Sequence, residues 1–439
     1  MKIYSDSFNS NYEKYFKKIE EKNEKSTFLD IDQFKLQKQI VEEFIKERDL
    51  KIYGGLAINV NLPENNKIYS DRDNKIVDYD VYTPYPRKNA VDLANKLFEK
   101  GFQYVTVQEG VNAGVYKVFN YFQEVIDLVY YPIKIFDAVP TITVNGMKYV
   151  TPKHLKIDLL VALTNPKQGL FRWEKDFERY NLLLKYFPTE KPKDFCVEKH
   201  KKKEYKLSQE INNILVNNKY NYIIWGNQAY YFYMLKSGLQ DYYEPELKYM
   251  EIGMENPDEF IRKIKEFFGA KIVVKKYHQF LKHIPPRYII TEKKNENNIL
   301  LIIYDLHEKC IPYIVDNGLK IISFNGLLLY YNFMYYLGKR HNIKYSLKLS
   351  ECCLYDLERA RTFYFNNSNT NRFNDNIFKE FILECLGTEK NIYRDNKIKQ
   401  WKREKKFLYI PAKRPHLSSG DKVGPGTVRF ISGEFEKII

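Results

Sequence analysis

Two short stretches decide the fold, IYGGLAINVNL at residues 52–62 and KIVDYDVYTPYP at residues 75–86. The first is typical of a short strand that passes through a glycine turn into a helix, and the second of a strand that ends in prolines. An amphipathic helix is predicted just before them, over residues 30–48, because apolar residues recur there with a period near 3.6. A helix over residues 87–102 and a strand over residues 121–132 are expected to follow. This alternation predicts an α/β (α+β) fold.

The chain also contains an internal repeat. Residues 52–62 recur at 223–234, and residues 144–163 recur at 316–335, with one offset of 172 positions. We therefore expect tandem modules of one α/β type. Chance similarity between apolar elements is the alternative.

Four segments are expected along the chain. A linker is predicted near residues 187–210, where prolines and basic residues gather. The segments are a helical N-terminal region over 1–49, a first module over 50–190, a second module over 211–390 and a basic tail over 391–439.

Composition limits the classes of function. The 439 residues carry a formal net charge of +15, which attracts phosphate backbones. The N-terminus lacks an apolar signal segment and no apolar run reaches membrane-spanning length, so we expect a cytoplasmic protein that is not secreted and has no membrane partner. Five cysteines without a C-x-x-C pair indicate neither a disulfide framework nor a zinc site, so reduced thiols are expected.

Three aspartates of the first module form a candidate metal site. Asp78 and Asp80 lie two apart in a predicted strand and therefore project from one face. Asp127 lies in the apolar strand VIDLV, where an unpaired carboxylate is costly. If the strand of Asp127 lies alongside at matching height, three carboxylates suit two hard cations about 3.5–4 Å apart.

That arrangement meets the needs of phosphoryl transfer to a hydroxyl, which requires neutralised charge on the phosphates and on the attacking and leaving oxygens. Gly54 and Gly55 have no Cβ, so their backbone amides can approach triphosphate oxygens at the start of a helix. Each motif alone has a structural alternative, a simple turn for the glycines and a solvated strand end for the aspartate pair. Together they favour a nucleotide-transfer site.

This pattern resembles the nucleotidyltransferase superfamily. GGLAIN, DYDVYT, GVYKVF, VIDLVYY, TPKHLKIDLL and FRWEKDFERYNLL more closely resemble the poly(A) polymerase catalytic subunit of poxviruses and other large cytoplasmic DNA viruses, strongly over residues 35–190 and more diffusely to 390. The resemblance implies two Mg²⁺ or Mn²⁺ ions on Asp78, Asp80 and Asp127, with ATP as substrate. The nucleotide-binding residues that it implies are Gly54, Gly55, Asn59, Lys117, Arg172, Lys175 and Arg179.

Several of these assignments have alternatives. Arg172, Lys175 and Arg179 have spacings that place them on one helix face, and a solvated basic stripe has the same spacing. Tyr116 is expected beside Lys117 on a wall that faces the nucleotide and primer. His154 is interpreted as a structural or capping residue.

The second module departs from the pattern at the same positions. When the prolines after the two strands are aligned, Tyr249 and Glu251 take the places of the aspartate pair, and Asn227 replaces the second glycine. Only Asp305 is expected to correspond to Asp127. We therefore interpret this module as degenerate, serving RNA binding or domain packing, as in the viral family that the chain resembles.

We thus expect a template-independent RNA nucleotidyltransferase that polyadenylates mRNA 3′ ends from ATP. The alternatives are a uridylyl- or CCA-adding enzyme, a non-catalytic RNA-binding scaffold, and an enzyme of this fold that modifies a protein or a small molecule. The resemblance implies a homodimer or a processivity subunit, and a place in the viral factory or virion. Nine Lys and Arg against two carboxylates over residues 394–417 predict RNA-phosphate contacts by Lys402, Arg403, Lys405 and Lys406.

Overall fold

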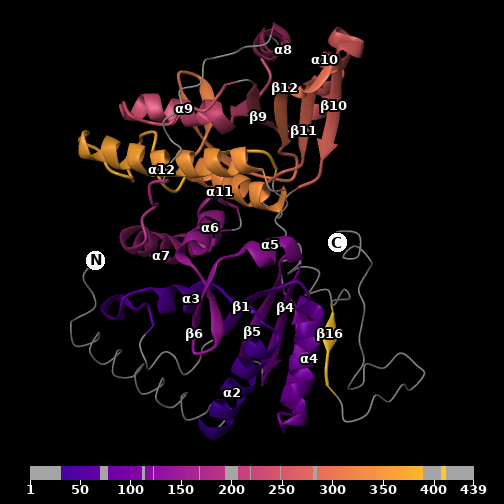
Figure 1. Cartoon of the computed structure of the whole chain (residues 1–439), viewed down its shortest axis with the longest axis vertical. Coiled ribbons are helices and arrows are strands. Elements are labelled where there is room, and N and C mark those ends of the chain that lie inside the picture. Colours follow the sequence, from indigo (N-terminus) through magenta and orange to yellow (C-terminus); the bar gives the residue numbers. More distant parts are fainter. Residues whose placement is uncertain are drawn as a thin grey trace, which may run out of the picture.

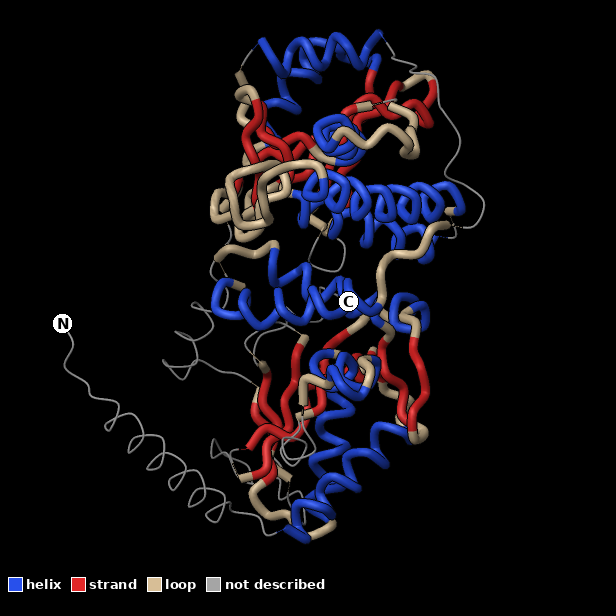
Figure 2. The backbone as a smooth tube through the Cα atoms, turned by 90° about the vertical axis from the view of Figure 1, so that its left-hand side faces the viewer, coloured by secondary structure: helices blue, strands red, loops and turns tan. Residues whose placement is uncertain are grey.

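The computed structural model describes residues 31–69, 78–110, 114–121, 123–167, 169–192, 206–217, 219–247, 249–279, 284–341, 343–388 and 407–411. Two α/β modules are stacked along the long axis, and a layer of helices lies between their sheets (Figures 1 and 2). That layer contains α6 (Pro152–Leu163), α7 (Trp173–Tyr186), α11 (Phe324–His341) and α12 (Lys344–Asn366).

The first module has an eight-stranded sheet in the order β16-β3-β4-β5-β2-β1-β7-β6. Its strands are β1 (Lys51–Ile52), β2 (Tyr79–Thr83), β3 (Val105–Glu109), β4 (Val115–Asn120), β5 (Gln123–Tyr130), β6 (Thr141–Val144), β7 (Met147–Val150) and β16 (Leu408–Tyr409). Its other helices are α2 (Ile31–Glu47), α3 (Gly54–Asn61), α4 (Pro86–Glu99) and α5 (Ile133–Ala138), with 3₁₀ turns η1 (Glu64–Asn66) and η3 (Leu170–Arg172). The β2–β5 and β1–β7 pairs are parallel, and the remaining pairs are antiparallel.

The second module repeats this plan with the order β10-β11-β12-β9-β8-β14-β13-β15. Its strands are β8 (Tyr222–Ile224), β9 (Met250–Met254), β10 (Ile272–Tyr277), β11 (Arg287–Glu292), β12 (Asn295–Asp305), β13 (Ile311–Asp316), β14 (Leu319–Ile322) and β15 (Cys385–Leu386). Its other helices are α8 (Lys206–Asn217), α9 (Gly226–Ser237) and α10 (Pro257–Phe268), followed by the 3₁₀ turn η4 (Gly269–Lys271). Seven strands have the same order and directions as in the first sheet, which confirms the predicted tandem modules.

One hairpin shows how local sequence fixes both copies. Asn145-Gly146 joins β6 to β7, and Asn317-Gly318 joins β13 to β14, with φ of 50°, 78°, 49° and 79° in that order. Positive φ at both central residues is what a tight two-residue hairpin turn requires, and Asn-Gly is the pair that adopts it most easily. The repeated dipeptide therefore sets the register of two neighbouring strands in each module.

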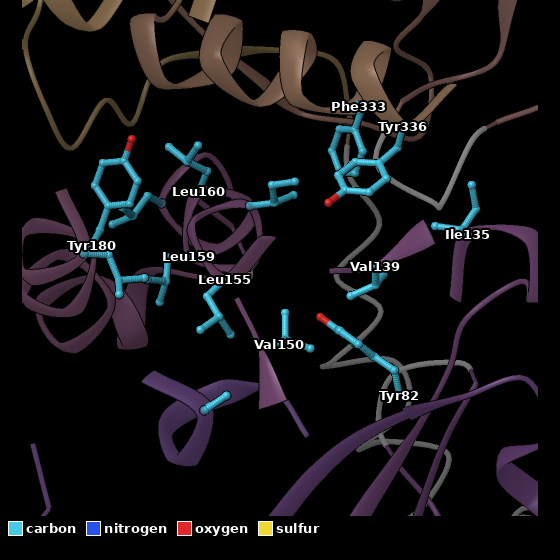
Figure 3. Close-up of a cluster of buried hydrophobic side chains, with 14 of the residues drawn as sticks. Tyr82, Ile135, Val139, Val150, Leu155, Leu159, Leu160, Tyr180, Phe333 and Tyr336 are labelled. Atoms are coloured by element: carbon cyan, nitrogen blue, oxygen red, sulfur yellow. The ribbon is translucent and has the colours of Figure 1, made fainter. Parts of the chain in front are cut away.

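A hydrophobic core runs continuously between the modules. Leu155, Leu159 and Leu160 of α6 and Tyr180 of α7 belong to the same buried cluster as Phe333 and Tyr336 of α11 (Figure 3). A second cluster lies under α8 and α10 of the second module. Because α11 contributes to the core of both modules, the two pack as one body.

The cysteines differ in part from expectation. A disulfide joins Cys310 to Cys385 beside the pairing of β13 with β15, so the prediction of reduced thiols is wrong for this pair. Cys353 is a buried free thiol. Over the described part of the chain, no helix is both long enough and apolar enough to span a bilayer.

Candidate active site

The paired strands β2 and β5 bring two of the predicted ligands together. Their parallel register places Asp80 directly opposite Asp127. Neighbouring residues in register project from the same face of a sheet, so both carboxylates lie on one face. Asp78 lies just before β2 and is exposed. Among the residues described, no three His, Cys, Asp or Glu side chains are grouped closely enough to hold a metal ion, so the predicted triad is assembled only in part.

The carboxyl groups of Asp80 and Asp127 both have raised pKa values. Burial and repulsion from Asp78 raise the pKa of Asp80 to about 6. Burial and the neighbouring Glu124 raise the pKa of Asp127 to about 9. Lys117 Nζ lies 2.7 Å from both Asp127 Oδ2 and Glu124 Oε1, so a protein cation already contacts this carboxylate.

The donor set fits a divalent cation. Asp127 Oδ1 is buried and has no hydrogen-bond partner, and buried carboxylate oxygens need a cation or a donor. Carboxylate oxygens are the ligands that Mg²⁺ prefers. Asp80 and Asp127 are therefore the residues best placed to hold a metal, and the assignment of Asp78 stays a prediction.

The glycine pair packs directly against these residues. Gly54 has φ +68°, and a Cβ at this position would collide with Asp80 Oδ2. A Cβ on Gly55 would collide with Tyr69 Oη. The Tyr53 N–H also donates to the Asp80 carbonyl over 2.9 Å. The positive φ of Gly54 favours glycine there, and the turn places the start of α3 beside Asp80.

Helix α7 and the 3₁₀ turn η3 before it supply the predicted cations. Arg179 Nη2 donates to Tyr69 Oη over 2.8 Å and lies beside Gly55. The pKa of Lys175 is lowered by burial and by nearby Arg179 and Arg172, so the three cations form one cluster. Arg172 ends η3 just before α7, pairs with Asp176 over 3.2 Å and is close enough to Asp80 to oppose the rise of its pKa.

Asn59 has a local structural role. Its Oδ1 accepts hydrogen bonds from the Ile68 and Tyr69 amides over 2.8 and 3.0 Å. Since Tyr69 in turn contacts Arg179, Asn59 helps to position the loop beside the glycine turn. Direct contact of Asn59 with a nucleotide stays a prediction.

Two other residues lie away from the site. Tyr116 is buried under Phe407, with ring centroids 5.4 Å apart, because alternation along β4 turns it to the face opposite Lys117. The expectation that Tyr116 faces the nucleotide is therefore wrong. His154 is buried, hydrogen-bonds with Tyr131 and has a pKa lowered to about 3 by burial, as expected of a structural histidine.

Sequence reasoning missed a fourth carboxylate. Asp158 of α6 accepts a hydrogen bond from Tyr82 over 2.5 Å, and Tyr53 stacks on Tyr82 at 4.0 Å. Burial raises the pKa of Asp158 to about 7, and repulsion from Asp80 adds to this shift. Asp158 lies inside the apolar run KIDLLVAL, and a carboxylate within an apolar run is the same feature that pointed to Asp127. This feature could have identified Asp158 from the sequence.

The second module keeps part of the same geometry. Glu251 occupies the position of Asp80, and Gly226, with φ +57°, packs against its carboxylate as Gly54 packs against Asp80. Glu251 is only 3% exposed and accepts hydrogen bonds from Tyr304 and Tyr330 over 2.9 and 2.8 Å. This carboxylate is satisfied within the core.

The register corrects one expectation. Glu251 pairs with Ile302, so Ile302 occupies the position of Asp127. Asp305 pairs with Met254, three residues further along β12, and the prediction that Asp305 corresponds to Asp127 is wrong. The second module therefore lacks two of the three carboxylates, which strengthens its interpretation as degenerate.

The tail is described only at residues 407–411. The predicted RNA contacts Lys402, Arg403, Lys405 and Lys406, and the basic run at 199–203, lie outside the described residues. Phe407 is 5% exposed and packs on the first module.

Comparison with known proteins addresses the family. Residues 39–169 match the family model of the poly(A) polymerase catalytic subunit. A protein of Acanthamoeba polyphaga mimivirus, assigned as such a subunit, is 27% identical over 91% of this chain and 76% of its own length. A protein of African swine fever virus (isolate Pig/Kenya/KEN-50/1950) with the same assignment is 34% identical over 34% of this chain and 33% of its own length.

The fold has a solved counterpart. The crystal structure of the Megavirus polyadenylate synthase superposes with a TM-score of 0.81 at 22% identity, covering 93% of this chain and 86% of that one. At this identity the likeness shows the fold, and the sequence matches show similarity to the catalytic-subunit family. Together these matches confirm the resemblance that the motifs predicted: the chain is similar to viral poly(A) polymerase catalytic subunits, and residues 39–169 are the part that matches the family model.

Proposed function

We propose that the first module transfers adenylate from ATP to the 3′-hydroxyl of RNA, with Asp78, Asp80 and Asp127 holding two divalent cations. The observation that carries this proposal is the register of β2 and β5, which sets Asp80 beside Asp127 next to a glycine turn. Divalent cations bound there would neutralise phosphate charge and lower the pKa of the attacking hydroxyl. The match of residues 39–169 to the family model of the poly(A) polymerase catalytic subunit supports the same reaction.

The surrounding residues have separate tasks in this proposal. The amides that follow Gly54 approach the triphosphate at the start of α3. Lys175 and Arg179 balance its negative charge from α7, at the position where Arg179 already lies beside Gly55. Lys117 would hold Asp127 in place until a metal or nucleotide competes for it, because its ammonium bridges two carboxylates.

The other segments complete the proposal. The second module, within residues 211–390, supports the first through the shared core, and the basic tail over 391–439 binds RNA by charge. The N-terminal helix α2 contacts β7 and α4 and so extends the first module. A processivity subunit or a second copy is the proposed partner, and the cytoplasm of an infected cell is the proposed location, since the relatives are viral.

Primer extension with labelled RNA, tested with each nucleoside triphosphate and with Mg²⁺ or Mn²⁺, separates the candidate functions. Extension by ATP alone supports polyadenylation. Preference for UTP, or addition of CTP followed by ATP, would select the uridylyl- or CCA-adding alternative. No extension with intact RNA binding would select the non-catalytic scaffold.

A matched pair of variants tests the residues. Asp127→Asn should reduce extension at least a thousandfold, because a metal ligand is lost. Asp305→Asn makes the same chemical change on the corresponding strand of the second module and should leave extension within twofold of wild type. Equal losses in both variants, with unchanged folding, would contradict the site.

A further inference from the structure

A groove of about 560 Å³ lies on the second module, away from the candidate active site. Helix α10 forms one wall and the strands β10 and β11 form the other. β10 ends the sheet, and across the described ranges its pairing partner is β11 alone (Figure 1). The groove therefore runs beside a strand edge with unpaired backbone groups.

The repeat identifies the same place on the first module. From the equivalence of Asp80 and Glu251, the strand registers lead to Tyr116 and Tyr288 as equivalent residues, and likewise to Glu109 and Lys276. Tyr288 and Lys276 line the groove. Its counterpart on the first module is thus the surface around Tyr116, between α4 and β3.

On the first module, an extended segment fills this place. β16 adds to the edge of β3 as an antiparallel strand, and the Glu109 N–H donates to the Phe407 carbonyl over 3.2 Å. Phe407 buries its ring against Tyr116. Tyr409 donates to Asn95 of α4 over 2.5 Å. An aromatic side chain and one backbone hydrogen-bond ladder therefore close the first groove.

The second groove differs in charge from the equivalent surface of the first module. Alignment of α10 with α4 at their first prolines puts Arg262, Lys265 and Glu266 where the first module has Val91, Ala94 and Asn95. In the part of the chain that the structure describes, Arg262 and Lys265 form no ion pair.

One acid of the groove is already engaged. Tyr288 donates to Asp258 over 2.9 Å, and Lys276 lies over the Tyr288 ring at 4.9 Å. The lining holds three cations, Arg262, Lys265 and Lys276, against the two carboxylates Asp258 and Glu266, so the groove has a net charge of +1 that favours an acidic occupant.

We propose that this groove binds an extended, acidic peptide segment of a partner protein. The segment adds to β10 as an antiparallel strand, as β16 adds to β3, and sets an aromatic side chain against Tyr288. Its carboxylates face Arg262 and Lys265. Strand addition supplies affinity through backbone hydrogen bonds, and the groove supplies specificity through side chains.

Fluorescence polarisation with the full chain tests this proposal. The probe is a labelled peptide, EEFLYIE, which keeps the sequence of residues 407–410 around β16 and adds acidic flanks. The comparison peptide is KKFLYIK. We expect saturable binding of the acidic peptide and at least tenfold weaker binding of the basic one. Absence of saturable binding, or equal binding of both peptides, overturns the proposal.

Two sets of variants locate the binding. Arg262→Glu with Lys265→Glu should weaken the acidic peptide at least tenfold, whereas Lys293→Glu with Lys294→Glu, an equal charge change at the exposed β11–β12 turn, should have less than a twofold effect. Equal effects of both doubles would indicate non-specific attraction and overturn the proposal. Circular dichroism of each variant confirms folding.

The contribution of backbone hydrogen bonds to peptide binding is tested at Lys276. Its amide is equivalent to the Glu109 amide, which donates to the Phe407 carbonyl. Lys276→Pro removes that donor and should abolish binding, while Lys276→Ala keeps it and should bind at least fivefold better than the proline variant. A competition experiment with RNA tests another occupant. If RNA displaces the peptide, and the Arg262→Glu/Lys265→Glu variant loses affinity for RNA by the same factor as for the peptide, the groove is part of the RNA-binding surface. If the peptide dissociates a dimer in sedimentation, the occupant is a second copy. Either result overturns the assignment to a partner protein.

Discussion

The carboxylates at equivalent positions of the two modules should respond oppositely to the same chemical change. Asp80→Asn removes a proposed metal ligand, and we expect transfer to fall at least a thousandfold with little loss of stability. Glu251→Gln keeps a hydrogen-bonding group between Tyr304 and Tyr330, and we expect wild-type turnover. The contrast follows from contacts, because Glu251 accepts hydrogen bonds from Tyr304 and Tyr330, whereas Asp80 lies close to the negative charge of Asp78.

Removing the whole Glu251 side chain should instead be a stability defect. Glu251→Ala leaves two buried tyrosine hydroxyls, on Tyr304 and Tyr330, without an acceptor. A buried polar group without a partner costs about 1–3 kcal/mol, and the lost side chain leaves a small cavity, so we expect unfolding to become easier by about 3–5 kcal/mol. At temperatures where this variant is folded, its turnover should match wild type.

Urea denaturation followed by tryptophan fluorescence measures this effect, because Trp225 lies 4.7 Å from the Tyr304 ring and reports on the second module. The sign of the pH dependence provides a control. Burial raises the pKa of Glu251 above its unfolded value, so its contribution to stability is greatest at low pH and declines as pH rises through the folded pKa. Glu251→Gln should remove that decline. Loss of transfer by folded Glu251→Gln would refute the reasoning, since it would make the second carboxylate catalytic.

Other predictions concern packing. Glu380→Ala leaves Arg361 and Arg372 without their carboxylate partner, which lies 3.4 and 3.0 Å from them. Chemical denaturation should show a free energy of unfolding lower by about 3–5 kcal/mol. Burial lowers the pKa of His154 to about 3, so its contribution is lost as pH falls below about 6.5; His154→Phe should reduce the stability difference between pH 7 and pH 4 by about 3 kcal/mol. Phe407→Ala should speed proteolytic release of the C-terminal segment at least tenfold with little change in the main melting transition, and an unchanged cleavage rate would contradict docking of that segment.

Sequence was sufficient where the information is local. The glycine turn, the Asn-Gly hairpins and the two-residue spacing of aspartates each depend on a few neighbouring residues, and their repetition at one offset predicted the tandem modules. Register between distant strands was not accessible in this way. Lys117 and Ile289 are equivalent residues of the two modules. Lys117 pairs with Asp127, ten positions later, whereas Ile289 pairs with Ile302, thirteen positions later. Because the second hairpin is three residues longer, Ile302 and not Asp305 lies at the position equivalent to Asp127.

One exchanged pair of residues accounts for the proposed difference between a reactive first site and an inert second one. Helices α6 and α11 correspond from their first residues, so Asp158 and Tyr330 are equivalent. On the first module, Asp158 is a further negative group near Asp80, and repulsion from Asp80 adds to the burial that raises the pKa of Asp158 to about 7. On the second module, Tyr330 donates a hydrogen bond to Glu251 instead. Exchange of a carboxylate for a hydroxyl donor on one helix thus satisfies the buried acid and removes its need for a cation. In the proposed function, the first module keeps Asp80 and Asp127 because their carboxylate oxygens would bind a divalent cation, which a hydroxyl donor from the core would displace.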